Sequence, residues 1–210
     1  MTIIGLAGFA RSGKDSVADI LVEHHGFTRI AFADKLRELA LWINPELGPR
    51  RMRLDDVLRL SMLDDPEMDL LDPLDRRAWE AAKLSTLGPH IRVFLQQLGE
   101  RARRVLGGDV WVDAAMRDLD PAGLYVIPDV RYPNEVDRVL ATCGNSLMWR
   151  VIRPGVGAAN DHVSENALHD RVFDASVLND GSLDDLRREV ADVYGAACTA
   201  YTAATHLEDS

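Results

Sequence analysis

Short apolar runs alternate along the chain with longer stretches in which apolar residues recur every three or four positions. Residues 2–7 form a continuous apolar run, as expected of a strand buried on both faces of a parallel sheet. A glycine-rich turn follows, and then a helical pattern that ends near Gly26. Four further strands are predicted, at 27–32, 124–127, 146–152 and 175–178.

Helical periodicity fills most of the remaining chain. Helices are predicted at 33–42 and at 183–204, the second with Ser182 as its N-cap. From about 44 to 106 the pattern is helical and charged, with proline breaks and no predicted strand. The alternation predicts one α/β domain over residues 1–210, with a doubly wound, mostly parallel five-stranded sheet and helices on both faces. The stretch 44–106 is too long for a crossover and predicts a helical insertion over the functional edge of the sheet.

The turn after the first strand carries the most specific motif. Residues 8–16, GFARSGKDS, fit the pattern G-x-x-x-x-G-K between a buried strand and a helix, which predicts a P-loop NTPase fold. Backbone N–H groups of such a loop converge on phosphate oxygens, and the helix N-terminus adds partial positive charge. Lys14 is expected to bridge the β- and γ-phosphates of ATP. The expected ATP-binding residues are Gly8, Arg11, Ser12, Gly13, Lys14, Asp15 and Ser16.

One residue of this loop departs from the usual pattern. Asp15 stands where a Ser or Thr hydroxyl commonly ligates Mg²⁺. A carboxylate beside a triphosphate would be repelled unless a cation lay between them. We therefore expect Asp15 to approach Mg²⁺ directly or through water, and Ser16 to bond an α-phosphate oxygen.

A second polar segment, DVRYPNE at 129–135, follows the strand predicted at 124–127. Asp129 is at the strand end, where P-loop proteins place a carboxylate facing Mg²⁺ or its waters. Arg131 can present a bidentate fork to a second phosphate. The segment predicts an acceptor site with Asp129 as a metal candidate and Arg131 in both binding and catalysis, although a turn with a surface ion pair would give the same pattern.

Further acceptor contacts are expected from the helical regions. The first turn of the helix at 33–42 carries Asp34, Lys35 and Arg37, and Lys35 is one of only three lysines beside 21 arginines, although a solvated helix face would give the same pattern. On the segment 92–101, a glutamine amide can bond a base edge and an arginine can reach a phosphate, but an ordinary amphipathic helix would look the same. The candidates there are Arg92, Gln96, Gln97 and Arg101.

Residues 153–172 follow the strand at 146–152 and suit a lid, because glycines bound a polar stretch that could close over ATP. Arg153, placed with the catalytic residues, and Arg171 are candidates for neutralising charge in the transition state. His162 is better explained as a surface side chain. After the last strand, Asn179 lies in a turn and is a candidate contact for adenine.

Composition narrows the class of partner. The formal net charge is 24 − 34 = −10, which suits no nucleic-acid polymer but allows a small anionic ligand held by local donors. No apolar run reaches the roughly 18–20 residues that span a bilayer, and no signal peptide is recognised, so no membrane partner and a cytoplasmic location are expected. Cys143 and Cys198 fit no metal or disulfide framework. A homodimer is kept as an expectation.

In their order along the chain, these segments resemble the bacteriophage deoxynucleoside monophosphate kinases, within the wider nucleoside-monophosphate kinase group. The matching segments are GKDS at 13–16, FADKL at 32–36, LQQLG at 95–99, DVRYPNE at 129–135 and VLNDG at 177–181. The resemblance implies a core domain, a helical acceptor-binding insertion, a lid, and Mg²⁺-dependent transfer of the γ-phosphoryl group of ATP to a dNMP, giving dNDP and ADP. It also implies that Arg131 binds the acceptor phosphate, that Gln96 or Gln97 reads the base, and that Asp15 is a family trait.

Two other functions remain open at this point. A kinase for another small acceptor, such as dephospho-coenzyme A, would share the fold. A nucleotide-dependent switch or DNA-processing ATPase would share the loop, but the chain has no Asn-Lys-x-Asp guanine motif and no basic stripe.

Overall fold

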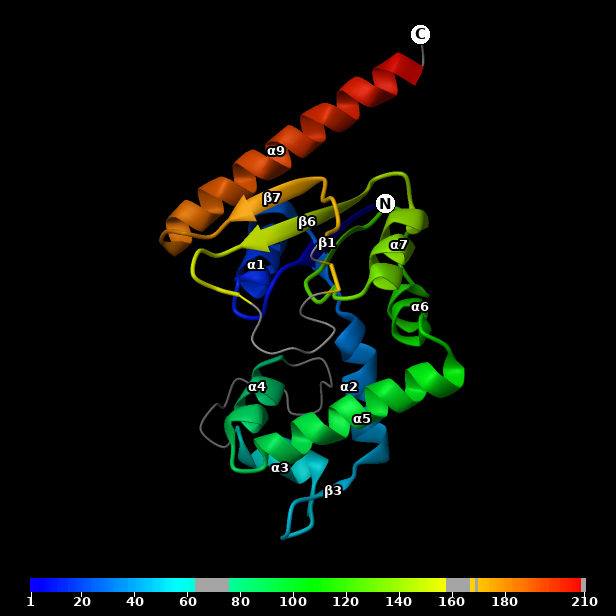
Figure 1. The fold of residues 1–210 in the computed structure, drawn as a ribbon, viewed down its shortest axis with the longest axis vertical. Helices are drawn as coiled ribbons and strands as arrows, with labels where there is room; N and C mark the ends of the chain where they lie inside the picture. The colour runs from blue at the N-terminus through cyan, green and yellow to red at the C-terminus, as the bar shows by residue number, and fades with distance from the viewer. Residues whose placement is uncertain (63–75, 158–166, 169, 209–210) are drawn as a thin grey trace. The chain divides into compact units, whose positions relative to one another are not determined.

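The structure, a computed structural model, describes residues 1–62, 76–157, 167–168 and 170–208, with side chains described as far as Thr199. The chain divides into two compact units (Figure 1). The first combines Met1–Ala31 with Asp118–Ser210, and the second is Phe32–Arg117. Each unit is a body with its own apolar core.

The first unit is built on a five-stranded sheet in the order β2-β5-β1-β6-β7, with every pair parallel. The strands are β1 (Thr2–Ala7), β2 (Thr28–Arg29), β5 (Leu124–Ile127), β6 (Ser146–Ile152) and β7 (Ala175–Leu178). The predicted sheet is confirmed. The predicted strand at 27–32 is shortened to β2, because its pairing ends where the Ile30 N–H donates to the Val126 carbonyl (3.1 Å) and a helix begins at Phe32.

Helices cover both faces of this sheet (Figure 1). On one face, α1 (Lys14–His25) and α9 (Leu183–Glu208) bury Val17, Leu21 and Val190 against Trp149 and other strand residues. On the other, α7 (Pro133–Thr142) packs on β6 and β1. The predicted α/β fold with a P-loop is confirmed, and the central position of β1 places the loop after it at the carboxyl edge of the sheet.

The start of α9 has the predicted cap. The Ser182 Oγ accepts a hydrogen bond from the Asp185 N–H (3.2 Å), and the Asp185 carboxylate accepts in return from the Ser182 hydroxyl and N–H. These bonds, the hydroxyl bond first, hold the pKa of Asp185 below its usual value.

The second unit is mainly helical around buried residues such as Leu54, Trp79 and Ile91. Its elements are α2 (Phe32–Ile43), β3 (Glu46–Leu47), β4 (Met52–Arg53), α3 (Leu54–Leu60), α4 (Arg76–Leu84), α5 (Gly88–Leu106) and α6 (Val110–Met116). The expectation of no strand between 44 and 106 is wrong, since β3 and β4 form a small antiparallel hairpin. Two-residue strands are too short to show alternation, and the turn depends on the positive φ of Gly48 and Arg51.

Several sequence expectations remain untested by this architecture. A single domain with an insertion at 44–106 and a lid at 153–172 stays a prediction, and part of the lid, 158–166 with His162 and residue 169, lies outside the described residues. Within the described chain, no helix combines the length and apolarity that crossing a bilayer requires. Cys143 and Cys198 form no disulfide with each other.

Candidate functional site

The loop between β1 and α1 depends on its two glycines. Gly8 has φ +144° and Gly13 has φ +104°, a region that favours glycine. A Cβ added at Gly8 would lie 2.4 Å from the Val151 carbonyl oxygen, and one at Gly13 would lie 2.3 Å from Asn179 Nδ2. Both positions are therefore closed to larger residues by backbone conformation and by close neighbours.

The chain after β7 supports this loop from the side. Asn179 Nδ2 donates to the Ser12 carbonyl (2.9 Å), and the Asn179 N–H donates to the Ile152 carbonyl (2.7 Å). The expected adenine contact of Asn179 stays a prediction, and its observed partner is the loop itself.

The loop has the donors that a phosphate requires. Lys14 Nζ donates to the carbonyls of Gly8 (2.6 Å) and Phe9 (2.8 Å), so its ammonium group lies across the loop. The Ser12 side chain is buried, and its Oγ has no hydrogen-bond partner among the described residues. A buried hydroxyl without a partner, beside the N-terminus of a 12-residue helix, fits a bound phosphate oxygen.

The carboxylate of Asp15 already has a cationic partner. Arg29, at the end of edge strand β2, places NH2 2.6 Å from Asp15 Oδ1. Among the described residues, no three His, Cys, Asp or Glu side chains gather as a metal site. Mg²⁺ commonly needs only one or two carboxylates beside waters and phosphates, so Asp15 and the half-buried Asp129 remain suitable donors for it.

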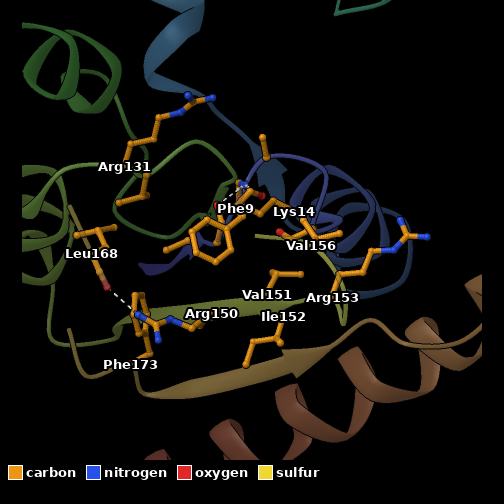
Figure 2. Close-up of a pocket in the computed structure, with 15 residues that line it drawn as sticks. Phe9, Lys14, Arg131, Arg150, Val151, Ile152, Arg153, Val156, Leu168 and Phe173 are labelled. Carbon is orange, nitrogen blue, oxygen red and sulfur yellow. Dashed lines mark hydrogen bonds between the residues drawn. The ribbon is translucent and has the colours of Figure 1, made fainter. Parts of the chain in front are cut away.

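A cavity of about 240 Å³ opens beside the loop (Figure 2). Its walls come from the P-loop, from β6 and from the segments that follow β5 and β6. The predicted site residues that line it are Gly8, Ser12, Lys14, Arg131 and Arg153. In Figure 2 the side chains of Arg131 and Arg153 extend from different sides, away from the Phe9 ring. The loop lysine and two predicted arginines therefore contribute to the walls of one cavity, with the guanidinium ends of both arginines directed outward from it.

Arg150 also lines this cavity and was not among the predicted site residues. It lies on β6, where its guanidinium carbon is 4.3 Å from the centre of the Phe173 ring and its NH2 donates to the Leu168 carbonyl (2.7 Å). The available signal was an arginine within the mostly apolar strand sequence SLMWRVI.

The loop after β5 is organised by a buried carboxylate. Glu135 is 2% exposed and accepts hydrogen bonds from the N–H groups of Arg131 (2.7 Å) and Tyr132 (3.1 Å), forming a capping box at the start of α7. The backbone that carries Arg131 is fixed in this way, while the Arg131 side chain is exposed. Glu135 belongs to the predicted motif at 129–135 but has no predicted role, and the available signal for it was a Glu three residues after a possible N-cap.

The remaining loop and lid candidates lie apart from the cavity walls. Arg11, with φ +66°, is exposed at the turn of the P-loop, and Ser16 is half-buried in the first turn of α1. Arg171 forms an ion pair with Asp137 of α7, and this bond ties it to the surface of the first unit.

The candidates of α2 lie in the second unit and are occupied by local partners. Asp34 and Arg37 form an ion pair (3.1 Å), with the Arg37 guanidinium carbon 5.9 Å from the centre of the Trp79 ring. Lys35 pairs with Glu38 (2.8 Å). Their acceptor contacts stay predictions.

The candidates of α5 share its exposed surface. Arg92 and Gln96 are one turn apart, as are Gln97 and Arg101, and all four are exposed. The Gln96 amide donates to Glu100 (3.0 Å). Trp111 of α6 packs against α5 instead of facing solvent, since it is 6% exposed and its N–H donates to the Gly99 carbonyl (3.4 Å).

Comparisons with known proteins support the resemblance stated from the sequence. No family model matches the chain. The chain is 27% identical over 206 residues to a candidate deoxynucleotide monophosphate kinase of Acanthamoeba polyphaga mimivirus, covering 90% of this chain and 94% of that protein. It is 36% identical over 62 residues to the deoxynucleotide monophosphate kinase of Enterobacteria phage T4, covering 30% of this chain and 25% of that protein. The resemblance to the phage-type enzymes is confirmed. The two likenesses support a nucleotide kinase of the P-loop type.

Among solved structures, the chain matches a gluconokinase of Sinorhizobium meliloti 1021 with 14% identity and a TM-score of 0.43, over 96% of this chain and 97% of the other. It matches the dephospho-CoA kinase of Campylobacter jejuni with 14% identity and a TM-score of 0.39, over 93% and 97%.

Proposed function

We propose that the kinase transfers the γ-phosphoryl group of ATP to a deoxynucleoside monophosphate, giving ADP and a dNDP in the cytoplasm. The observation that carries this proposal is that Lys14 of the P-loop and Arg131 after β5 line the same cavity. An ATP-hydrolysing loop needs one anion site, whereas a nucleotide kinase needs a second for the acceptor phosphate. The names of the two viral relatives support a deoxynucleotide as the acceptor.

In this proposal, each residue of the site has a role that follows from its position. ATP would supply the phosphoryl group, and Asp15 and Asp129 would hold Mg²⁺, whose charge would offset that of the phosphates. Lys14 leaves the Gly8 and Phe9 carbonyls to bond the β- and γ-phosphate oxygens. Arg131 binds the acceptor phosphate and holds it in line with the donor, because phosphoryl transfer depends on positioning and charge more than on covalent chemistry.

Other residues of the first unit complete this arrangement. Arg153, at the end of β6, neutralises developing charge, and Ser12 donates its otherwise unpaired hydroxyl to a phosphate oxygen. Within the second unit, the exposed Arg92, Gln96, Gln97 and Arg101 of α5 are the proposed contacts for the acceptor base and phosphate.

An acceptor panel tests the function. Purified protein with ATP and Mg²⁺ is given each dNMP, each NMP, dephospho-coenzyme A or duplex DNA, and ADP release and the phosphorylated product are both measured. We expect ADP release that requires a dNMP, with the matching dNDP formed in equal amount. Phosphorylation of dephospho-coenzyme A alone, or DNA-stimulated hydrolysis with no phosphorylated acceptor, would refute the proposal. Arg131→Lys serves as the matched variant, because it keeps the charge and loses the bidentate fork.

A further inference from the structure

The ion pair between Asp15 and Arg29 lies at the entrance of the helix that follows the P-loop. Asp15 is next to Lys14 in the first turn of α1, and Arg29 comes from β2, at the carboxyl edge of the same sheet. The two side chains are joined at 2.6 Å, with 24% of the Arg29 side chain and 66% of the Asp15 side chain exposed. Neither the motif of the loop nor the fold requires a cation at the position of Arg29.

The ion pair reduces the electrostatic repulsion that the Asp15 carboxylate would exert on a bound triphosphate. A carboxylate beside a triphosphate repels it, and the repulsion is stronger near a protein surface than in bulk water. A guanidinium in contact with the carboxylate offsets this charge before any metal arrives. Mg²⁺ at the same carboxylate would offset it as well, so Arg29 and Mg²⁺ are alternative counter-charges for one group.

The Arg29 side chain is suited to exchange partners. Among the described residues, Asp15 is its one hydrogen-bonding partner, and the Arg29 Nε is buried without an acceptor. The guanidinium has five N–H groups, so one bond to Asp15 leaves it far from saturated. Only the bond to Asp15 has to break for the guanidinium to exchange partners, and its unused N–H groups can then donate to a phosphate oxygen or to water.

We propose that Arg29 is a positioning residue for the metal site: it neutralises and orients Asp15 in the nucleotide-free kinase, and Mg²⁺ displaces it from that carboxylate when Mg·ATP binds. The inference rests on the proposed binding of Mg·ATP by this loop. It goes beyond that function because it assigns to Arg29 an effect on nucleotide affinity. Arg29 would strengthen the binding of metal-free ATP relative to the binding of Mg·ATP.

The test is the dissociation constant of ATP measured by calorimetry twice for each variant, once in excess Mg²⁺ and once in EDTA. In Arg29→Ala, binding in EDTA is expected to weaken about three- to tenfold more than binding in Mg²⁺, because only the metal-free complex depends on the guanidinium as counter-charge. Arg29→Lys is expected to restore most of the wild-type ratio. In the Asp15→Asn background, adding Arg29→Ala is expected to leave the ratio unchanged.

A matched control is available on α9. Arg187 forms an ion pair of the same length with Asp184 (2.6 Å) and also has a buried Nε without a partner among the described residues. Arg187→Ala should leave the Mg²⁺/EDTA ratio at the wild-type value.

Equal weakening in both buffers for Arg29→Ala, or the same change of ratio with and without Asp15→Asn, would overturn the inference. If wild-type protein binds no ATP in either buffer, the proposed function fails and this inference fails with it, whereas normal ATP binding with an unaltered ratio removes the role of Arg29 alone. Circular dichroism confirms folding, and Arg29→Lys keeps the test decisive if Arg29→Ala does not fold.

Discussion

Two loops of the first unit follow neighbouring parallel strands, and they are held in different ways. The P-loop after β1 is shaped by backbone, with positive φ at Gly8, Arg11 and Gly13 and with carbonyl oxygens that accept from Lys14. The loop after β5 has no glycine, and the buried side chain of Glu135 holds it by accepting two backbone N–H bonds.

This difference has a functional meaning. A loop that wraps phosphates with its own N–H groups must keep those groups free, so its shape has to come from glycine conformations and close packing. A loop that presents one arginine side chain can use its N–H groups for internal bonds. A Cβ added at Gly8 or Gly13 should therefore disrupt the shape of the first loop. Loss of the Glu135 carboxylate should disrupt the shape of the second.

The largest effect is expected from the side chain that the second loop presents. Arg131→Ala should lower kcat about 10³-fold, since arginines that stabilise phosphoryl transfer contribute about 10³–10⁵. The melting temperature should stay close to wild type, because the Arg131 side chain is exposed. Steady-state kinetics with a dNMP and a thermal melt measure both. Arg138→Ala, an equal charge change on α7, is the control, and near-normal kcat/KM for Arg131→Ala would remove it from the site.

The corresponding change in the first loop is Lys14→Met. We expect kcat to fall about 10²–10³-fold, the usual loss for removing one donor to transition-state charge. Stability should change little, because Lys14 is only half-buried and its ammonium group donates to the loop carbonyls of Gly8 and Phe9, outside the apolar core of the unit. ATP affinity by calorimetry and single-turnover rates separate binding from chemistry, and a variant with unaltered kcat would contradict the role.

The backbone of the first loop is probed by Gly8→Ala. The added Cβ would meet the Val151 carbonyl at 2.4 Å and Ser12 Oγ at 2.9 Å, at a φ of +144°. Strain of this kind costs about 1–3 kcal/mol, and a domain of this size loses about 2–4 °C of melting temperature per kcal/mol. Gly26→Ala is the matched control, with positive φ but nothing within 4 Å, and it should lose less stability and no ATP binding. Equal losses in the two variants would argue against the close approach.

The smallest effect is expected from Glu135→Gln. The amide oxygen can still accept from the Arg131 and Tyr132 N–H groups, but without the charge that strengthens these bonds, so we expect a loss of about 1 kcal/mol of stability. Glu135→Ala should cost more and should raise KM for the acceptor while leaving KM for ATP nearly unchanged. Urea unfolding and kinetics measure these changes, and equal shifts of both KM values would mean that Glu135 supports the whole unit and not the Arg131 loop.

The sheet was predictable because its long strands are continuous apolar runs. The bounds of β5, β6 and β7 agree with the runs at 124–127, 146–152 and 175–178. The β3–β4 hairpin was not predictable, since strands of two residues have no period and their turn uses a positive φ at Arg51, which no residue preference signals.

The P-loop was predictable for a different reason, because phosphate binding through backbone N–H groups imposes glycines at fixed spacing. Contacts between distant side chains impose no spacing. No sequence motif therefore predicts the ion pair of Arg29 with Asp15 or the stacking of Arg150 on Phe173. The one signal for each contact was a charged residue within or beside an apolar strand. The roles of the other predicted site residues stay predictions.

The bond from Asn179 to the Ser12 carbonyl also bears on how the protein is made. It joins residues 167 positions apart, so the phosphate loop emerges early from the ribosome and its last support emerges late. At about 5–20 residues per second, that interval is roughly 10–30 s. During synthesis, the nascent chain therefore carries the loop sequence for many seconds before it can complete the loop, which would delay nucleotide capture until β7 has joined the sheet.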